Sequence, residues 1–312
     1  MTRFVNKVVV VGGGTMGCAV AAIFNVAGWT AYVVETDELV RLGLPGRIDA
    51  AAQTLGASGR EIPSIICGAL VDVDWADVDI VIECVFEDLA LKQAVFAEIE
   101  ALCPAPTPLT SNSSSFPIGQ IGKGLATQSR MLGLHFFMPA HLVPAVEVIS
   151  SQASDEPTAV RVSEIMRAVG KKPIRVKRDI PGFLANRIQH ALMREAIALV
   201  EEDFASPEDV DAAVRYGFGF RYIAAGPLLQ KDLAGIDIHC AAAATMYPYL
   251  RTDQEPSAHM RQLVANGHIG VKSASLRGFY QWTPEQVAVE QKRYEAALLK
   301  AARILSDEEV GH

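Results

Sequence analysis

The sequence predicts an α/β fold, with a doubly wound parallel sheet in the first half and an all-α domain in the second. In the first half, short apolar strands alternate with helical segments, which is the order that builds a parallel sheet. From Leu184 onward the apolar residues recur with a helical period. Pro181 and Gly182 interrupt both periodicities, so we expect two domains, residues 1–178 and 179–312.

The first expected unit is a strand over residues 7–11, a glycine turn and a helix over residues 15–27. Gly12 allows the turn, Gly14 lets the backbone approach a pyrophosphate, and Gly17 permits close helix packing. The helix N-terminus can then hold the anion. The whole turn reads Gly12, Gly13, Gly14, Thr15, Met16 and Gly17.

The second strand, over residues 31–34, ends at Glu35. This acid follows the glycines by about 20 residues, as a ribose contact requires. A carboxylate there accepts from ribose hydroxyls and repels a 2′-phosphate. The pattern therefore predicts a Rossmann-type domain that binds NAD rather than NADP, and a glycine turn that binds nothing is the alternative.

Polar residues follow two further expected strands, over residues 79–83 and 107–110. Ligands of a parallel sheet gather at the carboxyl ends of its strands, so Glu87 and the Ser/Asn run at 111–115 are placed near the cofactor. Lys92 could reach the same edge. Taken alone, Glu87 and Lys92 are read as a surface ion pair, and the polar run as a loop.

The remaining elements are mostly helical. A strand over residues 173–177 closes the first domain, and helices are expected to start near Ser154, Leu184, Ser206, Ala234 and Thr283. The last has a capping box, Thr283-Pro284-Glu285-Gln286, and continues to about Leu305. A small helical domain with this much apolar face often completes its core by pairing, so we expect a homodimer through the C-terminal domain.

Composition narrows the function classes. The 28 basic and 36 acidic residues give a formal charge of -8 without a basic block, which argues against nucleic acid or an anionic membrane as a partner. Five scattered cysteines are typical of reduced thiols. The N-terminal apolar run is too short for a signal peptide or a membrane span. We expect a cytoplasmic protein that handles a small molecule.

The stretch at 133–147 carries His135 and Glu147 among apolar and proline residues. A histidine can exchange a proton near neutral pH, and a carboxylate can fix its tautomer. From the residues alone, a satisfied core histidine is the plain alternative. His141 raises the possibility of a His-His-Glu metal site, but Pro139 breaks any regular spacing, so no metal is expected.

These pieces, in this order, resemble the L-3-hydroxyacyl-CoA dehydrogenase family, which also holds relatives that act on free hydroxy acids, such as L-gulonate and L-carnitine dehydrogenases. The resemblance covers nearly the whole chain. It rests on the glycine turn at 12–17, Glu83 with Glu87 and Lys92, Ser-Asn-Ser-Ser at 111–114, Gly-Leu-His-Phe-Phe at 133–137, Val-Glu-Val at 146–148, Pro-Gly-Phe-Leu-Ala-Asn-Arg at 181–187 and Gly-Phe-Tyr at 278–280.

The resemblance implies an NAD-dependent dehydrogenase. His135 is similar to the family's catalytic base and Glu147 to its partner carboxylate. Ser114 and Asn186 look like the residues that hold substrate and cofactor. Further NAD contacts are implied at Glu35, Glu87, Lys92, Ser114 and Lys272. His135 would take the hydroxyl proton as hydride moves to the nicotinamide.

Three departures from the family bear on the substrate. Met138 stands where the family usually has asparagine, and the loop at 270–280 is two residues longer, which weakens the assignment of Lys272. Residues 36–75 form a shorter segment than in acyl-CoA members, with six acids, no lysine and three arginines, Arg41, Arg47 and Arg60. This is a poor platform for the phosphates of coenzyme A. The sequence therefore favours a 3-hydroxy acid or related secondary alcohol, with an acyl-CoA as a close alternative.

Two other classes stay open. The fold also serves non-catalytic nucleotide-binding or structural proteins, such as the lens crystallins related to this family. Retention of His135 and Glu147 argues against that class. A hydrolase using a serine from 111–115 is disfavoured, because no Gly-x-Ser-x-Gly elbow surrounds those serines.

Overall fold

The computed structural model describes residues 4–57 and 64–310. The chain divides into two compact units, Met1–Leu184 and Ala185–His312. Arg60, one of the arginines considered for phosphate binding, lies outside the described residues.

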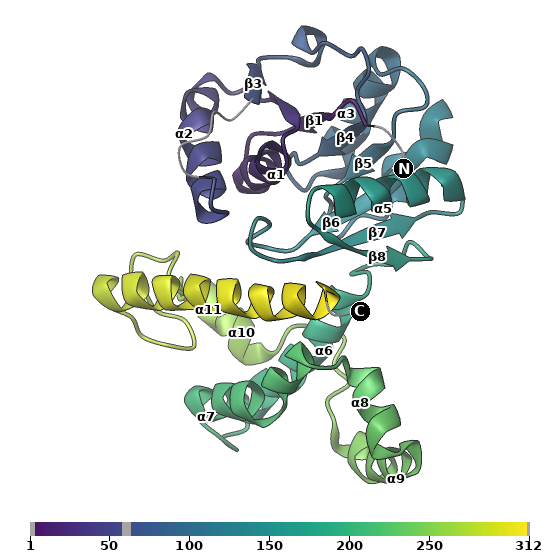
Figure 1. Cartoon of the computed structure of the whole chain (residues 1–312). Helices are drawn as coiled ribbons and strands as arrows, with labels where there is room; N and C mark the ends of the chain where they lie inside the picture. Colours follow the sequence, from purple (N-terminus) through teal and green to yellow (C-terminus); the bar gives the residue numbers. More distant parts are fainter. Residues whose placement is uncertain (1–3, 58–63, 311–312) are drawn as a thin grey trace. The chain divides into compact units, whose positions relative to one another are not determined.

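The first unit is built on one eight-stranded sheet with the order β3-β2-β1-β4-β5-β6-β7-β8 (Figure 1). The strands from β1 to β6 are parallel; β7 is antiparallel to β6, and β8 is parallel to β7. The predicted parallel sheet is confirmed, and the antiparallel pairing of β6 with β7 departs from the prediction. The strands are β1 (Lys7–Val11), β2 (Thr30–Val34), β3 (Ser64–Cys67), β4 (Ile80–Glu83), β5 (Leu109–Ser111), β6 (Met131–Phe136), β7 (Ala145–Ser150) and β8 (Lys172–Val176).

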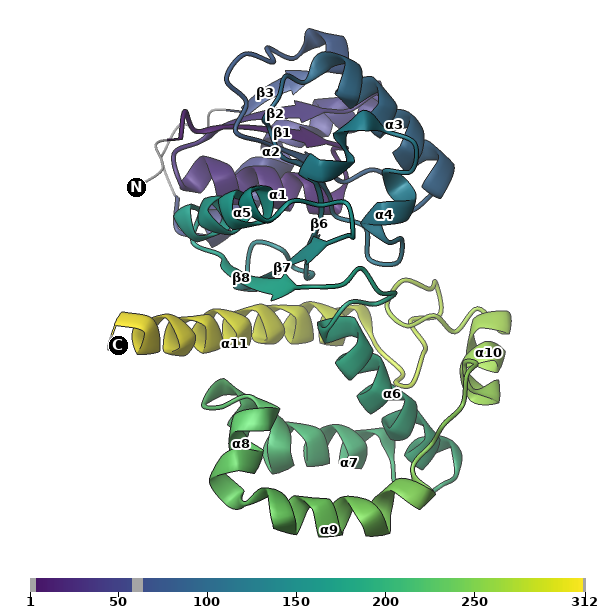
Figure 2. The same ribbon diagram turned by 90° about the vertical axis from the view of Figure 1, so that its right-hand side faces the viewer.

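Helices cover both faces of this sheet (Figure 2). One apolar cluster joins the sheet to α1, α2 and α5, and a second joins the opposite face to α3 and α4. Aspartates start three of these helices, since Asp37, Asp88 and Asp155 each accept the backbone N–H three residues on. The helices are α1 (Thr15–Val26), α2 (Glu38–Thr54), α3 (Leu89–Leu102), α4 (Ile118–Ile121) and α5 (Glu156–Ala168), with short turns η1 (Leu70–Asp72) and η2 (Ala126–Arg130).

The second unit is helical, as the sequence predicts. The predicted capping box is present, because Thr283 N–H donates to the Gln286 side chain and Gln286 N–H to Thr283 Oγ. The unit contains α6 (Ala185–Glu201), α7 (Pro207–Ala212), η3 (Ala213–Phe218), η4 (Gly219–Ile223), α8 (Pro227–Ala234), α9 (Ile236–Met246), η5 (Tyr247–Tyr249), α10 (Ala258–Ala265) and α11 (Pro284–Val310).

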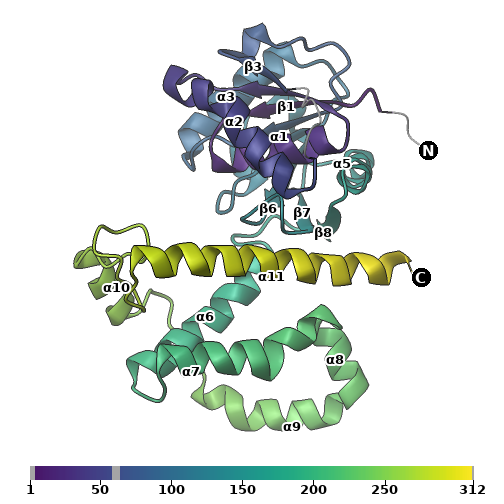
Figure 3. The same ribbon diagram turned by 60° about the vertical axis from the view of Figure 1, so that its left-hand side comes forward.

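The helices of the second unit bury little of their apolar surface. In Figures 2 and 3, α6, α7, α8 and α9 form an open frame rather than a closed bundle. Among the residues of this unit whose burial is described, Ala198 alone is buried. No helix in the described part of the chain is both long and apolar enough to cross a membrane.

Candidate active site and cofactor cradle

The predicted base and its carboxylate face each other across two strands. In the antiparallel pairing of β6 with β7, His135 lies directly opposite Glu147, which places both side chains on the same face. His135 Nδ1 is 2.9 Å from Glu147 Oε2, and the two residues are 4% and 0% exposed. The backbone N–H of Leu184 donates to the other oxygen, Oε1. A carboxylate held in this way favours the tautomer with hydrogen on Nδ1, which leaves Nε2 as an acceptor.

Ser114 completes a hydrogen-bonded chain through the imidazole. Its Oγ is 3.0 Å from His135 Nε2. Ser114 lies in the loop that follows β5, next to the carboxyl end of β6. The sequence analysis predicted that residues 111–115 lie at this edge of the sheet. The order Ser114, His135, Glu147 therefore provides a route by which a proton at Nε2 is balanced by a buried negative charge.

The serine loop is organised by one carboxylate. Glu87 Oε1 accepts from the side chains of Ser113 and Ser115 and from the backbone N–H groups of Ser114 and Ser115. Burial would raise the pKa of Glu87, but these hydrogen bonds and the nearby Lys92 outweigh it and lower the pKa to about 2. Glu87 thus stays ionised at neutral pH and holds the loop that presents Ser114.

Lys92 is buried, so its interpretation as half of a surface ion pair is wrong. Its side chain is 1% exposed, and Nζ lies 2.8 Å from Glu83 and 3.3 Å from Glu87. Lys92 lies in the first turn of α3 and reaches Glu83 at the end of β4, a contact that a pairwise spacing rule does not take into account. Burial raises the pKa of Glu83, while Lys92, Ser111 and a backbone N–H oppose the rise.

The glycine turn has the geometry of a nucleotide cradle. A Cβ at Gly12, where φ is +105°, would lie 2.7 Å from the Cys84 carbonyl, and a Cβ at Gly17 would lie 1.8 Å from the Gly12 carbonyl. Nothing lies within 4 Å of a Cβ at Gly14. Gly12 and Gly17 are thus required by the fold, whereas Gly14 faces open space at the start of α1, where a pyrophosphate can approach.

Glu35 is held beside this turn. Its Oε2 accepts the Gly13 N–H at 2.8 Å, and its Oε1 accepts the Asp37 N–H at 3.0 Å. Thr15 and Met16 form the first turn of α1. The turn and the acid at the end of β2 are therefore adjacent, which fits the predicted pyrophosphate and ribose contacts of NAD.

Two aromatic rings enclose the imidazole, and the sequence identified neither of them. Phe137 meets His135 edge-on with ring centroids 4.8 Å apart, and Phe183 lies 5.5 Å away. Phe183 is 1% exposed and has φ +49°, an unusual conformation for a bulky residue. The Pro-Gly dipeptide before it was interpreted as a hinge and as part of the motif at 181–187. That conformation turns the segment so that Phe183 packs on His135 and Leu184 N–H reaches Glu147.

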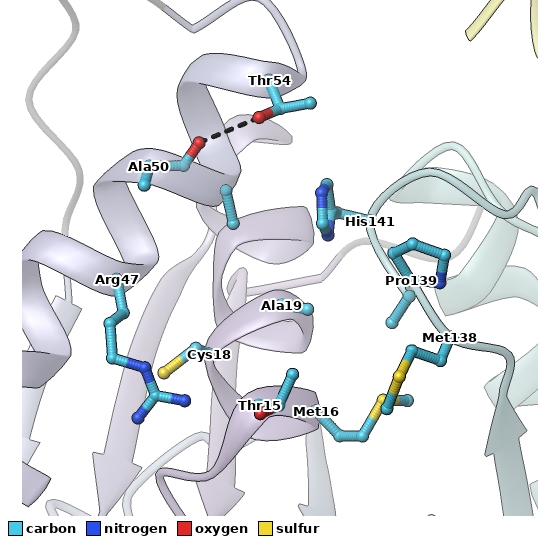
Figure 4. Close-up of a pocket in the computed structure, with 12 residues that line it drawn as sticks. Thr15, Met16, Cys18, Ala19, Arg47, Ala50, Thr54, Met138, Pro139 and His141 are labelled. Atoms are coloured by element: carbon cyan, nitrogen blue, oxygen red, sulfur yellow. Dashed lines mark hydrogen bonds between the residues drawn. The ribbon is translucent and has the colours of Figure 1, made fainter. Parts of the chain in front are cut away.

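A pocket of about 340 Å³ lies beside the glycine turn, between α1, α2 and the connection from β6 to β7 (Figure 4). Figure 4 shows Arg47 and His141 on opposite sides of it, with Met16 and Met138 converging at one end. Met138 is 66% exposed. The other residues that line the pocket are Thr15, Cys18, Ala19, Ala50, Ala51, Thr54, Pro139 and Ala140.

The last two predicted site residues belong to the second unit. Asn186 lies in the first turn of α6, and Lys272 lies in the loop before α11. Over residues 4–57 and 64–310, no three His, Cys, Asp or Glu side chains are grouped so that they could hold a metal ion.

Comparison with known protein families matches both halves of the chain. The family model described as 3-hydroxyacyl-CoA dehydrogenase, NAD binding domain, matches residues 7–180. The model described as 3-hydroxyacyl-CoA dehydrogenase, C-terminal domain, matches residues 182–282.

Two curated relatives span nearly all of the chain. The 5-formyl-3-hydroxy-2-methylpyridine 4-carboxylate 5-dehydrogenase of Mesorhizobium japonicum is 29% identical over 310 residues, which cover 98% of this chain and 100% of the relative. The 3-hydroxybutyryl-CoA dehydrogenase of Mycobacterium tuberculosis is 33% identical over 292 residues, which cover 90% of this chain and 100% of the relative.

Solved structures of the same two kinds are also similar. A crystal structure of the pyridine-carboxylic acid 5-dehydrogenase, described as an NAD+ dependent dismutase, has a TM-score of 0.90 at 28% identity and covers 97% of this chain and 99% of its own. The (S)-3-hydroxybutyryl-CoA dehydrogenase of Ralstonia eutropha has a TM-score of 0.71 at 27% identity, covering 89% and 99%.

Proposed function

The chain belongs to the 3-hydroxyacyl-CoA dehydrogenase family and is an NAD-dependent oxidoreductase, and we propose that its substrate is a small free hydroxy acid or related secondary alcohol. The hydrogen-bonded chain Ser114–His135–Glu147 supports the proton-transfer half of this reaction. The hydrogen bonds that Arg41 and Arg47 make to backbone carbonyls support the choice of a free acid over a thioester.

The proposed mechanism uses His135 as the general base. NAD held at the glycine turn would supply the hydride acceptor for the carbinol carbon. His135 Nε2 removes the hydroxyl proton at the same time, since an alcohol cannot release hydride while it keeps that proton. Glu147 stabilises the imidazolium, and Ser114 Oγ orients the reacting oxygen. In reverse, His135 protonates the developing alkoxide.

Cofactor binding is proposed at the cradle and in the C-terminal region. Glu35 would bind the ribose hydroxyls, and the turn from Gly12 to Gly17 the pyrophosphate. Glu87 and Lys92 would act mainly by holding Ser114. We also place Asn186 and Lys272 among the substrate and cofactor contacts, on the strength of the family pattern, and take residues 179–312 as the domain that supplies them.

Both described arginines of the segment after β2 donate to backbone carbonyls of the chain itself. Arg41 donates to the carbonyls of Glu35 and Thr36, and Arg47 donates to the carbonyl of Gly13. Coenzyme A carries a pyrophosphate and a 3′-phosphate, which need several free basic partners. Alanine and methionine make up half of the residues that line the pocket beside this segment, and the lining contains one arginine and one histidine. Such a lining offers no second basic side chain for a pyrophosphate.

The relatives support both substrate classes. The similarity to an enzyme named for a pyridine carboxylate, with a TM-score of 0.90, supports a small free acid. The 33% identity to a 3-hydroxybutyryl-CoA dehydrogenase keeps the thioester as the second candidate.

The test is NADH formation with paired substrates, each offered as a free hydroxy acid and as its CoA thioester. We expect kcat/KM for the best free acid to exceed that for its thioester by at least about tenfold, since the thioester gains no phosphate contacts. His135→Asn is the matched blank. A higher kcat/KM for the thioester would contradict the substrate proposal, and NAD binding without turnover of any substrate would favour a non-catalytic binding protein.

We also propose a cytoplasmic homodimer. The described residues of the second unit leave large apolar side chains uncovered, including Leu228 and Leu233, which are 82% and 77% exposed. A unit of this size with a single buried residue needs a partner to complete its core. All five cysteines are free, which is typical of a reducing compartment.

A further inference from the structure

Lys171 carries a buried ammonium that neither the sequence analysis nor the proposed mechanism uses. It lies between the end of α5 and the start of β8 and is 8% exposed. Its Nζ donates to the carbonyls of Ala140 at 2.7 Å, Val143 at 2.8 Å and His141 at 3.4 Å. All three acceptors belong to residues 137–144, the connection between β6 and β7, which we call the β6–β7 loop.

The β6–β7 loop connects the two proposed catalytic strands and borders the pocket beside the glycine turn. It joins the strand that carries His135 to the strand that carries Glu147. Its residues 138–141 also form one wall of the pocket beside the glycine turn. Irregular backbone leaves carbonyls without ladder partners, and a buried carbonyl without a donor is costly. One ammonium with three donors satisfies three such carbonyls at once.

We propose that Lys171 is a positioning residue of the dehydrogenase, which fixes the β6–β7 loop and thereby one wall of the pocket beside the glycine turn. This proposal rests on the proposed function in taking the pocket as the substrate side. The strands themselves are already held by the β6–β7 ladder and by the bond from Leu184 to Glu147. Loss of the ammonium should therefore affect substrate binding more than the proton-transfer step.

The protonation of Lys171 adds a pH dependence. Burial lowers the pKa of Lys171 to about 8. The one other titratable side chain on the β6–β7 loop is His141. As the pH rises through about 8, the ammonium becomes an amine with two donors, and one carbonyl of the loop loses its partner.

The first test compares Lys171→Met with Lys172→Met, a matched change at the exposed neighbour. For the best substrate of the panel, we expect Lys171→Met to raise KM about tenfold and to lower kcat less than about threefold, because charged hydrogen bonds to the loop are lost. Lys171→Arg should restore part of the KM, and Lys172→Met should leave both constants near wild type. A KM within about twofold of wild type in Lys171→Met overturns the proposal.

Hydrogen–deuterium exchange separates this proposal from the proposed function, because it needs no substrate. Lys171→Met should lose protection in residues 137–144 and keep it in β1 and β2. Unchanged exchange in the β6–β7 loop overturns the role of Lys171 whatever the substrate proves to be. If no compound of the panel is turned over while the loop still loses protection, the proposed function fails and the positioning role stands.

A measurement on the wild type covers the case in which Lys171→Met does not fold. KM should rise between about pH 7.5 and 9.5 for a substrate that does not titrate in this range, while the Kd for NAD stays constant. A KM that is flat over this range overturns the proposal.

Discussion

Glu147 uses both carboxylate oxygens on groups that define the site. Oε2 meets His135 Nδ1, and Oε1 accepts the Leu184 N–H. The residue is fully buried, so its charge is effective in stabilising an imidazolium beside it. This geometry supports the proposed role of Glu147 in fixing the tautomer of His135.

Replacing this carboxylate by an amide tests that role. We expect Glu147→Gln to lower kcat by about 10² to 10⁴-fold, since the amide is neutral and can present the wrong group to Nδ1. The Kd for NAD should stay within about twofold. Glu156→Gln, at an exposed ion pair with Arg175, is the control. A kcat close to wild type in Glu147→Gln would remove the carboxylate from the mechanism.

The lowered pKa of Glu87 leads to a second prediction, which concerns how the free energy of unfolding depends on pH. Its pKa is about 2 in the folded chain and below its ordinary value, so the unfolded chain binds more protons between these two values. The stabilisation is therefore fully present above the unfolded pKa and is lost as the pH falls toward about 2. Because Glu87 is 40% exposed, solvent screens part of the effect.

Urea unfolding over a range of acid pH measures this contribution. The free energy of unfolding of Glu87→Gln should fall less steeply with decreasing pH than that of the wild type. Glu98→Gln, at an exposed site on the nearby helix α3, should leave the slope unchanged. Equal slopes for wild type and Glu87→Gln would mean that the serine loop does not depend on the carboxylate.

At the scale of the element, two glycines of the strand–turn–helix unit are expected to serve different roles, one in folding and one in cofactor binding. Gly17→Ala puts a Cβ where the Gly12 carbonyl lies, whereas Gly14→Ala puts one into open space. We expect Gly17→Ala to lower the free energy of unfolding by about 1–3 kcal/mol or more. Gly14→Ala should change stability little and weaken NAD binding, because the added methyl meets the pyrophosphate. Urea unfolding and calorimetric NAD titration measure the two effects.

The two variants serve as controls for each other. Wild-type affinity for NAD in Gly14→Ala would contradict the placement of the pyrophosphate at the start of α1. Wild-type stability of Gly17→Ala would require α1 to shift away from β1.

The sequence analysis did not predict the strands β6 and β7 or their antiparallel pairing. Local patterns identified β1, β2 and the helix starts at Asp155 and Ser206, because strand hydrophobicity and caps are properties of neighbouring residues. Residues 131–150 contain prolines and a long connection, so their alternation was not interpreted as two strands. Register between strands depends on the whole sheet, and no local signal sets His135 opposite Glu147.

At the scale of the whole molecule, the open second unit predicts a dimer. Leu229 and Leu233 lie one turn apart on α8 and are 52% and 77% exposed. We expect wild type to have the mass of a dimer by light scattering, and the double variant Leu229→Asp with Leu233→Asp to dissociate or lose stability. The matched control places aspartates at Leu39 and Leu42 on α2, which are 81% and 75% exposed. A monomeric wild type would contradict the prediction.

The sequence by itself determined the fold class, the NAD cofactor and the family, because a strand, a glycine turn, an acid at the next strand end and the order of motifs are local or sequential features. Only the tertiary structure decided how distant residues meet. It paired His135 with Glu147, buried Lys92, turned Phe183 onto the imidazole and brought Lys171 to the β6–β7 loop. These contacts join residues far apart in the chain, and their geometry follows from sheet register and packing, which no short sequence pattern encodes.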